Sequence, residues 1–211
     1  MKQLALIAVF FLLASALVCA DDQAKTQLRE DTDDVDRMYW GEDLPHNDAR
    51  AVRKYRQAAE RGSASAQFKL ALMYDSGRGV PQDYAEAVKW LRKAAAKGFV
   101  EAQYHLGSMY NSGQGLSQDD TKAVKWFRKA AERGSVGAQK NLGAKYGKGQ
   151  GVPQNHAEAY IWSSIAANSG DEGAIKNRDF AASKLSPEDL GAAQKRAAKL
   201  HEEIQQRKAA Q

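Results

Sequence analysis

The sequence has little cysteine and little proline. Its 211 residues include one cysteine, four prolines and 17 glycines, which excludes a disulfide framework, a cysteine-based zinc site within one chain, and a collagen-like or low-complexity chain. Hydrophobic residues make up 43% and charged residues 27%, as in an ordinary globular protein, and the length suffices for one domain or two small ones. These values exclude classes of protein without indicating a function.

Long apolar runs are absent except at the N-terminus. There the run extends from Leu4 to Val18 and is followed by Cys19, Ala20 and an acidic stretch. At about 15 residues it is shorter than the roughly 20 that a permanent membrane span needs, and it has the character of a secretory signal peptide. We predict a signal peptide over 1–20, cleaved after Ala20, with lipid attachment at Cys19 as the alternative. The mature protein is expected to be periplasmic or secreted, with no transmembrane segment.

Charge is distributed unevenly along the chain. Residues 21–45 carry nine acidic and three basic side chains, and we expect this segment to be flexible. From residue 46 onward there are 27 basic and 17 acidic residues, so the folded body is basic. Because an exported protein rarely meets nucleic acid, the expected anionic partners are cell-surface polymers, lipid headgroups or acidic proteins. A basic surface with no charge-specific partner is the alternative.

The chain aligns with itself without gaps at an offset of 36 residues. Full units run over 64–99, 100–135 and 136–171, after a half unit over 47–62. This fixed period predicts a repeat architecture. The coincident residues are Tyr74, Tyr110 and Tyr146; Leu70, Leu106 and Leu142; Trp90, Trp126 and Trp162; Ala87, Ala123 and Ala159; Gly79, Gly115 and Gly151; and Gly62, Gly98, Gly134 and Gly170.

Each unit is predicted to contain two helices. In the first full unit, apolar residues recur at three- and four-residue spacing from Ala66 to Tyr74, until a Gly-Arg-Gly loop begins at Gly77. A second helix is expected from Asp83 to Lys97, with acidic residues in its first turn and basic residues near its end. Neither helix can bury its apolar stripe alone, so successive pairs must stack.

The repeated tryptophans are interpreted as core residues. Trp90, Trp126 and Trp162 fall inside the buried stripe of the second helix, among small alanines. Stacked aromatic residues can also bind sugars or bases, but this position in the stripe argues against such a platform.

These motifs resemble the Sel1-like repeat (SLR), a relative of the tetratricopeptide repeat with a longer inter-helix loop. The resemblance rests on a pattern that covers residues 47–175. It implies an all-α protein, a right-handed α-solenoid of helix-turn-helix repeats that binds other proteins and is frequently exported or envelope-associated in bacteria. The residues that carry it are Ala66, Gln67, Leu70, Tyr74, Gly77, Arg78, Gly79, Val80, Asp83, Ala87, Trp90, Lys93, Ala94, Ala95 and Gly98, and, in the next unit, Gly113, Gln114, Gly115, Leu116, Trp126, Lys129, Ala130 and Ala131.

The third unit departs from the pattern at its second helix. Ser164 and Ile165 stand where the preceding unit has Arg128 and Lys129, so a face that is solvated earlier is expected to be covered here. The expected cover is a helix that starts with Ser186 as its N-cap. We therefore assign 46–172 to the solenoid and 173–211 to C-terminal capping helices, with a coiled-coil dimer as the alternative role of the last helix. Its expected seam is Leu190, Ala193, Ala197, Leu200 and Ile204.

No catalytic motif is present. The glycine loops lack the third glycine of a dinucleotide fingerprint and the Gly-Lys-Ser/Thr of a P-loop, so they are interpreted as turns. Some cysteine-rich relatives are linked with β-lactam binding or hydrolysis, but no serine here is followed three residues later by lysine. His105 occupies the repeat position of Lys69 and Asn141, which indicates an exposed helix face. We expect no enzymatic activity, no cofactor and no metal site.

The function predicted from the sequence is a non-enzymatic adaptor of the bacterial cell envelope. We expect a monomeric solenoid whose concave groove holds a protein or peptide segment. The alternatives are an envelope enzyme acting on peptidoglycan or β-lactams, and a binder of anionic glycan or lipid. By superposition on the tetratricopeptide helix, the first helices of the units are expected to line the groove, with an acidic partner selected by its lysines. An alternative has Phe68 and Tyr104 packing only against adjacent helices. The expected groove residues are Phe68, Leu72, Asp75, Tyr104, Ser108, Asn111, Lys140 and Lys148, together with Ser65, Glu101 and Ala144.

Overall fold

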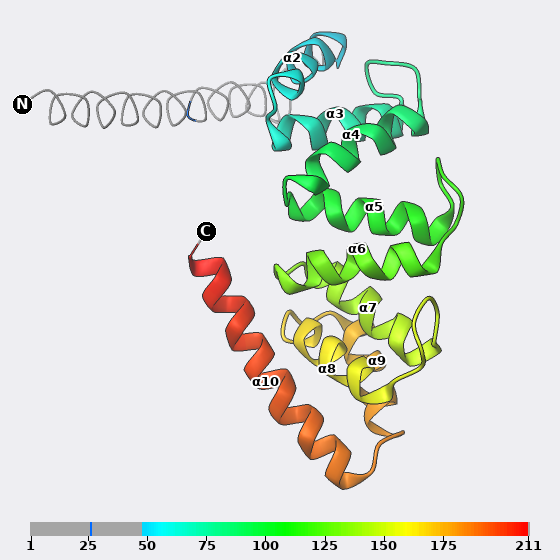
Figure 1. Cartoon of the computed structure of the whole chain (residues 1–211), viewed down its shortest axis with the longest axis vertical. Helices are drawn as coiled ribbons and strands as arrows, with labels where there is room; N and C mark the ends of the chain where they lie inside the picture. Colours follow the sequence, from blue (N-terminus) through cyan, green and yellow to red (C-terminus); the bar gives the residue numbers. More distant parts are fainter. Residues whose placement is uncertain (1–25, 27–47, 211) are drawn as a thin grey trace, which may run out of the picture. The chain divides into compact units, whose positions relative to one another are not determined.

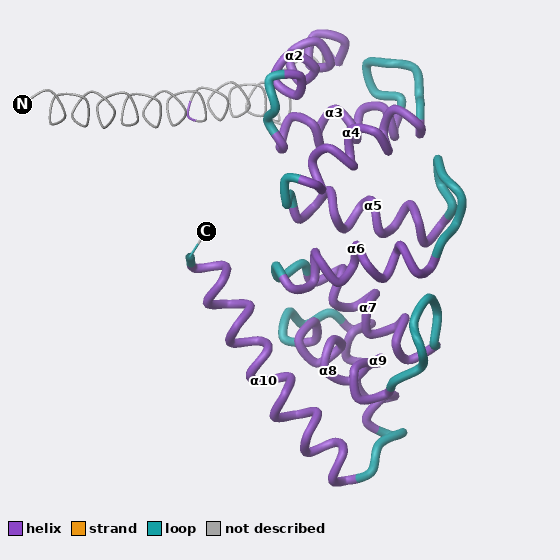
Figure 2. Tube along the Cα trace, in the orientation of Figure 1, coloured by secondary structure: helices purple, strands orange, loops and turns teal. Residues whose placement is uncertain are grey.

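A computed structural model describes Thr26 and residues 48–210, and the regular structure in that part of the chain is entirely helical (Figure 1). Figure 2 shows short loops joining the helices from residue 48 onward. The chain divides into two compact units, residues 1–82 and 83–211. The predicted signal peptide over 1–20 and the predicted acidic segment over 21–45 lie outside the described residues, apart from Thr26.

The first unit contains α2 (Asp48–Glu60) and α3 (Ala64–Ser76), which pack against each other. The buried face of α2 includes Val52 and Tyr55. Gly77 ends α3 with φ at 72°, in the left-handed region that favours glycine, as the Gly-Arg-Gly loop predicted.

The second unit contains the other seven described helices, which pack mainly against their neighbours along the chain. The start of α4 confirms the predicted helix, because Asp83 is the N-cap and its carboxylate accepts hydrogen bonds from the backbone N–H groups of Ala85 and Glu86. The helices are α4 (Tyr84–Ala96), α5 (Val100–Ser112), α6 (Asp120–Glu132), α7 (Val136–Lys148), α8 (His156–Ala167), α9 (Glu172–Ala182) and α10 (Pro187–Ala209).

Recurring side-chain hydrogen bonds explain why glutamine and tyrosine repeat in the sequence. Gln103 Nε2 donates to the Ala95 carbonyl oxygen at 3.1 Å and is buried, so it ties α5 to the end of α4. Arg92 donates to the Tyr110 hydroxyl at 3.0 Å, which adds a second tie between the same two helices. The same pairs recur between α2 and α3 as Gln67 with Ala59 and Arg56 with Tyr74, and between α6 and α7 as Gln139 with Ala131 and Arg128 with Tyr146.

The inter-helix loops are turns whose second glycine touches a helix start. Gly115 has φ at 71°, and a Cβ there would lie 2.5 Å from Tyr84 Cβ, at the start of α4. Gly151 has φ at 74° and lies directly against the backbone of Asp120, at the start of α6. Glycine is required at both positions for two reasons. Any other residue would be strained at this positive φ, and its Cβ would clash with the neighbouring helix.

Burial confirms two of the three tryptophans as core residues and corrects the third. Trp90 and Trp162 are buried, but Trp126 is only half-buried. Its neighbour Phe127, 1% exposed, fills the core position instead. Close packing explains why Phe127 is the buried residue. Its ring lies against Gly107 of α5, where the missing side chain leaves room for it.

The last helix begins where the sequence predicted. Ser186 is its N-cap and Pro187 its first residue, and α10 packs along α8. Ala193, Ala197 and Ile204 of the expected seam are buried, while Leu190 and Leu200 are half-buried. Ile165 of α8 is buried too, so the face that departs from the repeat pattern is covered.

Candidate functional site

In the first unit, Phe68 is buried and does not line the expected groove. Its side chain is only 7% exposed, so it is a core residue and does not offer a free surface for a partner. Leu72 and Asp75 are half-buried on the same helix, as is Ser65. The expectation that Phe68 lines the groove is therefore wrong, because an apolar ring at a helix interface gains more from packing than from exposure.

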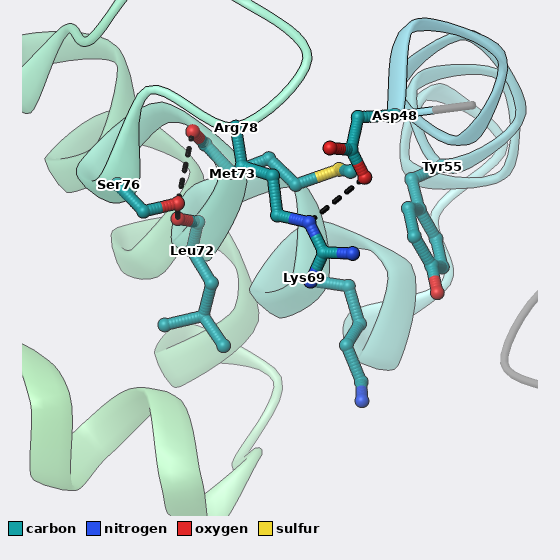
Figure 3. Close-up of a pocket in the computed structure, with 7 residues that line it drawn as sticks. All are labelled: Asp48, Tyr55, Lys69, Leu72, Met73, Ser76 and Arg78. Atoms are coloured by element: carbon teal, nitrogen blue, oxygen red, sulfur yellow. Dashed lines mark hydrogen bonds and ion pairs between the residues drawn. The ribbon is translucent and has the colours of Figure 1, made fainter. Parts of the chain in front are cut away.

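A small cavity in the first unit lies beside Leu72. Figure 3 shows Asp48 and Tyr55 extending from α2, with Arg78 bound to Asp48. Arg78 Nε donates to Asp48 Oδ1 at 2.8 Å, and Ser76 Oγ donates to the Leu72 carbonyl oxygen at 2.8 Å. The cavity measures about 40 Å³, which suffices for only a few water molecules. It offers no room for a partner's side chain.

In the second unit, Tyr104 lies in a cleft large enough for side chains of a partner. The cleft measures about 380 Å³ and includes residues of α5, the turn between α6 and α7, and the end of α10. We name it the Tyr104 cleft. Its lining residues are Val100, Glu101, Tyr104, His105, Arg133, Gly134, Ser135 and Lys208.

Packing fixes the orientation of Tyr104. Its ring centroid lies 6.0 Å from that of Phe127 and 5.7 Å from that of His105, the latter edge-on. A Cβ at Gly137 would lie 3.0 Å from Tyr104 Cε2 and Cζ, so the absence of a side chain there lets α7 approach the ring. Tyr104 thus packs on adjacent helices, as the alternative held, and at the same time remains half-buried at the cleft.

The turn between α6 and α7 forms the basic side of the cleft. Gly134 has φ at 87°, and the side chain of Lys208 from α10 lies directly over it. Arg133 is half-buried, and its Nε is buried without a hydrogen-bond partner in the described part of the protein. Its guanidinium lies near the preceding turn, since a Cβ at Gly98 would lie 2.7 Å from Arg133 Nη1. Arg133 and Lys208 therefore line the cleft together with one acidic residue, Glu101.

The other residues predicted for the groove do not line this cleft. Lys140 Nζ instead donates to Asp171 Oδ2 at 2.8 Å, and this hydrogen bond, together with the one from the Ala174 N–H, holds the pKa of Asp171 below its ordinary value. Lys148 is exposed at the end of α7, and Ser108, Asn111 and Ala144 are half-buried. Of the expected groove, the structure brings together only Tyr104 and Glu101 in the cleft.

Three titratable residues of the Tyr104 cleft, His105, Arg133 and Lys208, were not predicted from the sequence. His105 was expected on an exposed face but is half-buried beside Tyr104, as are Lys69 and Asn141 at the equivalent positions. The sequence gives a weak indication of Arg133, because Lys97, which precedes the equivalent turn glycine, is also basic. The sequence gives no indication that Lys208 lies at the cleft, because its position depends on how α10 crosses the unit.

Neither a metal-binding cluster nor a candidate membrane span occurs among the described residues. They contain no group of three or more His, Cys, Asp or Glu side chains placed to hold a metal ion. No described helix combines the length and the apolar character that a membrane crossing requires.

Comparison with known proteins identifies the repeats. The Sel1 repeat family model matches residues 37–63, 64–99, 100–135 and 136–171. The last three ranges coincide with the units found at the 36-residue offset, and the first begins upstream of the predicted half unit. A search of curated proteins finds no significant match.

Two solved structures are similar over most of the chain. One is a protective antigen present in uropathogenic Escherichia coli strains that displays an SLR fold, with 34% identity and a TM-score of 0.71 over 88% of this chain. This chain spans only 40% of the length of that antigen. The other is a Sel1 repeat protein from Oxalobacter formigenes, with 30% identity and a TM-score of 0.67 over 85% of this chain and 74% of its own.

Proposed function

Because the chain belongs to the Sel1 repeat family, we propose that it is a non-enzymatic adaptor of the bacterial cell envelope that binds a protein or peptide segment at the Tyr104 cleft. Repeats of this family typically serve as protein-interaction scaffolds. Export is part of the proposal and rests on the apolar N-terminal run that precedes the acidic stretch.

The observation that carries the proposal is the half-buried ring of Tyr104 in a cleft of about 380 Å³. Aromatic side chains held rigid by their neighbours supply a large share of binding energy at interfaces, because little conformational entropy is lost on binding. The packing of Tyr104 against Phe127 and Gly137 provides this rigidity.

The charges of the cleft favour an acidic segment. Arg133 and Lys208 lie in it with one carboxylate, Glu101. Arginine forms bidentate ion pairs with carboxylates, and a lysine at the rim of an interface increases the rate of association with an acidic partner. Lys140, which was expected to select the acidic partner, is bound to Asp171, so Arg133 and Lys208 take over that role in the proposal.

The proposal is tested by affinity capture from envelope extracts with three single variants. Tyr104→Ala removes the ring, Lys208→Glu reverses the charge at the cleft, and Lys195→Glu makes the same charge change at an exposed position of α10 outside the cleft. The proposal expects a discrete set of proteins captured by the parent and by Lys195→Glu, and lost with the other two. Equal capture by all three folded variants would show that the Tyr104 cleft is not the binding site.

A further inference from the structure

The three repeated tryptophans differ in exposure. Trp90 is 6% exposed and Trp162 is 3% exposed, whereas Trp126 is half-buried and lines a cleft of about 490 Å³. We name it the Trp126 cleft. Its lining residues are Thr121, Lys122, Val124, Lys125, Trp126, Arg128, Lys129, Glu132, Gly151 and Val152, and none of them belongs to the Tyr104 cleft.

The loop between α7 and α8 closes one side of this cleft. Gly151 lies against the backbone of Asp120 and thereby places Val152 near α6. The equivalent residue one repeat earlier is Leu116, whose loop lies against the start of α4, and the tryptophan of that helix, Trp90, is buried. Valine is one methylene shorter than leucine, so the third unit offers less apolar cover at this position. The lining that remains between the charges is apolar and includes Val124, Trp126 and Val152.

Four cations and one carboxylate line the cleft, and two of the cations are already engaged. Arg128 donates to the Tyr146 hydroxyl, and Lys122 Nζ lies 2.8 Å from Asp119 Oδ2. Lys129 Nζ lies 4.4 Å from the centroid of a Trp126 ring, in a cation–π contact. Within residues 48–210, neither Lys125 nor Lys129 forms an ion pair with a carboxylate.

We propose that the Trp126 cleft binds an acidic segment of a partner protein, which inserts one apolar side chain beside Trp126 and Val152 and pairs its carboxylates with Lys125 and Lys129. Charge complementarity selects the acidic segment, and the apolar lining selects a peptide over a purely charged polymer. A sugar stacked on the tryptophan is disfavoured because Lys129 lies over that ring. This second site stands independently of the function proposed for the Tyr104 cleft.

The direct test is fluorescence anisotropy with a labelled peptide of alternating aspartate and glutamate around a central leucine. The full chain should bind it saturably, and an otherwise identical peptide with a central alanine should bind about fivefold more weakly, because a buried apolar side chain contributes of order 1 kcal/mol. The double variant Lys125→Glu, Lys129→Glu should lose about tenfold or more in affinity.

Matched variants separate this site from non-specific attraction and from the other cleft. The double variant Lys195→Glu, Lys199→Glu makes the same charge change on an exposed part of α10, and it should bind as the parent does. Each of four results would overturn the proposal. They are equal losses of affinity in the two double variants, equal binding of the leucine and alanine peptides, loss of binding with Lys208→Glu, and no saturable binding. Circular dichroism on each variant establishes that it is folded, and Trp126→Phe, which keeps an aromatic ring, should retain most of the affinity.

Discussion

Gly107 of α5 lies against the ring of Phe127 of α6, so closely that a Cβ at Gly107 would be 2.7 Å from Phe127 Cδ1. Both residues are buried, and Phe127 is only 1% exposed, so this contact lies in the core, away from solvent. The small residue on one helix and the large residue on the next therefore form a matched pair that determines how closely α5 and α6 pack.

The first prediction follows from this pair. Gly107→Ala should destabilise the protein by about 1–2 kcal/mol, because overpacking outweighs the gain in helix propensity. The matched control is Gly147→Ala in α7, where the new Cβ would lie 3.7 Å from Ala159 Cβ, an ordinary contact. The control should be neutral or slightly stabilising in urea unfolding. A Gly107→Ala protein as stable as this control would show that the two helices are not packed as described.

The second prediction separates two adjacent aromatic residues of α6. Phe127→Ala should cost about 3–5 kcal/mol, because it leaves a cavity in the core. Trp126→Ala should cost clearly less, since its ring is half-buried at a cleft. The sequence placed Trp126 in the core, but Phe127 is the buried residue of the two. Thermal and urea midpoints of the two variants decide the order, and a larger loss for Trp126→Ala would contradict it.

The third prediction concerns acid. Lys140 and the N–H of Ala174 hold the pKa of Asp171 below its ordinary value, so the carboxylate is favoured in the folded state. The associated stability is present above the unfolded-state pKa of about 3.9 and is lost as the pH falls through the lower folded value. In Lys140→Met the pKa of Asp171 should rise toward its ordinary value. Carboxyl ¹³C shifts report it, and an unchanged pKa would show that Lys140 does not contact Asp171 in solution.

The fourth prediction concerns α10. We propose that it caps the last repeat, because Ile204 and Ile165 are both buried and line the same small cavity between α10 and α8. A chain ending at Leu185 should expose Ile165, melt at a lower temperature and self-associate in light scattering. In the full chain, Ile204→Ala should cost about 2–5 kcal/mol. A shortened chain that stays monomeric with an unchanged midpoint would instead make α10 a segment for binding partners.

The sequence predicted the parts of this fold that depend on one helix and its ends. The N-cap at Asp83, the stop at Gly77 and the helix start at Ser186 follow from local hydrogen bonding and backbone freedom, which do not depend on distant residues. The family follows from the period, since the recurring Gln and Tyr positions each mark a hydrogen bond to the preceding helix.

The candidate sites were less predictable because they depend on packing between distant segments. The pairing of Lys140 with Asp171 joins residues 31 positions apart, which the repeat pattern does not encode. The burial of Phe68 and the partial exposure of Trp126 depend on their surroundings, although both occupy ordinary repeat positions. The periodicity identifies the face of each helix, while neighbouring elements decide which part of that face remains open.

The most direct measurement of the central claim, that the Tyr104 cleft binds a protein segment, is site-directed photocrosslinking in cells. A photoreactive benzoylphenylalanine replaces Glu101, which is exposed at the cleft, or Glu188, which is exposed at the start of α10 and lies outside it. The account predicts a discrete crosslinked protein with the Glu101 replacement, none with the Glu188 replacement, and loss of the Glu101 product when Lys208→Glu is added. No crosslinked protein at Glu101, or the same product from both positions, would contradict it.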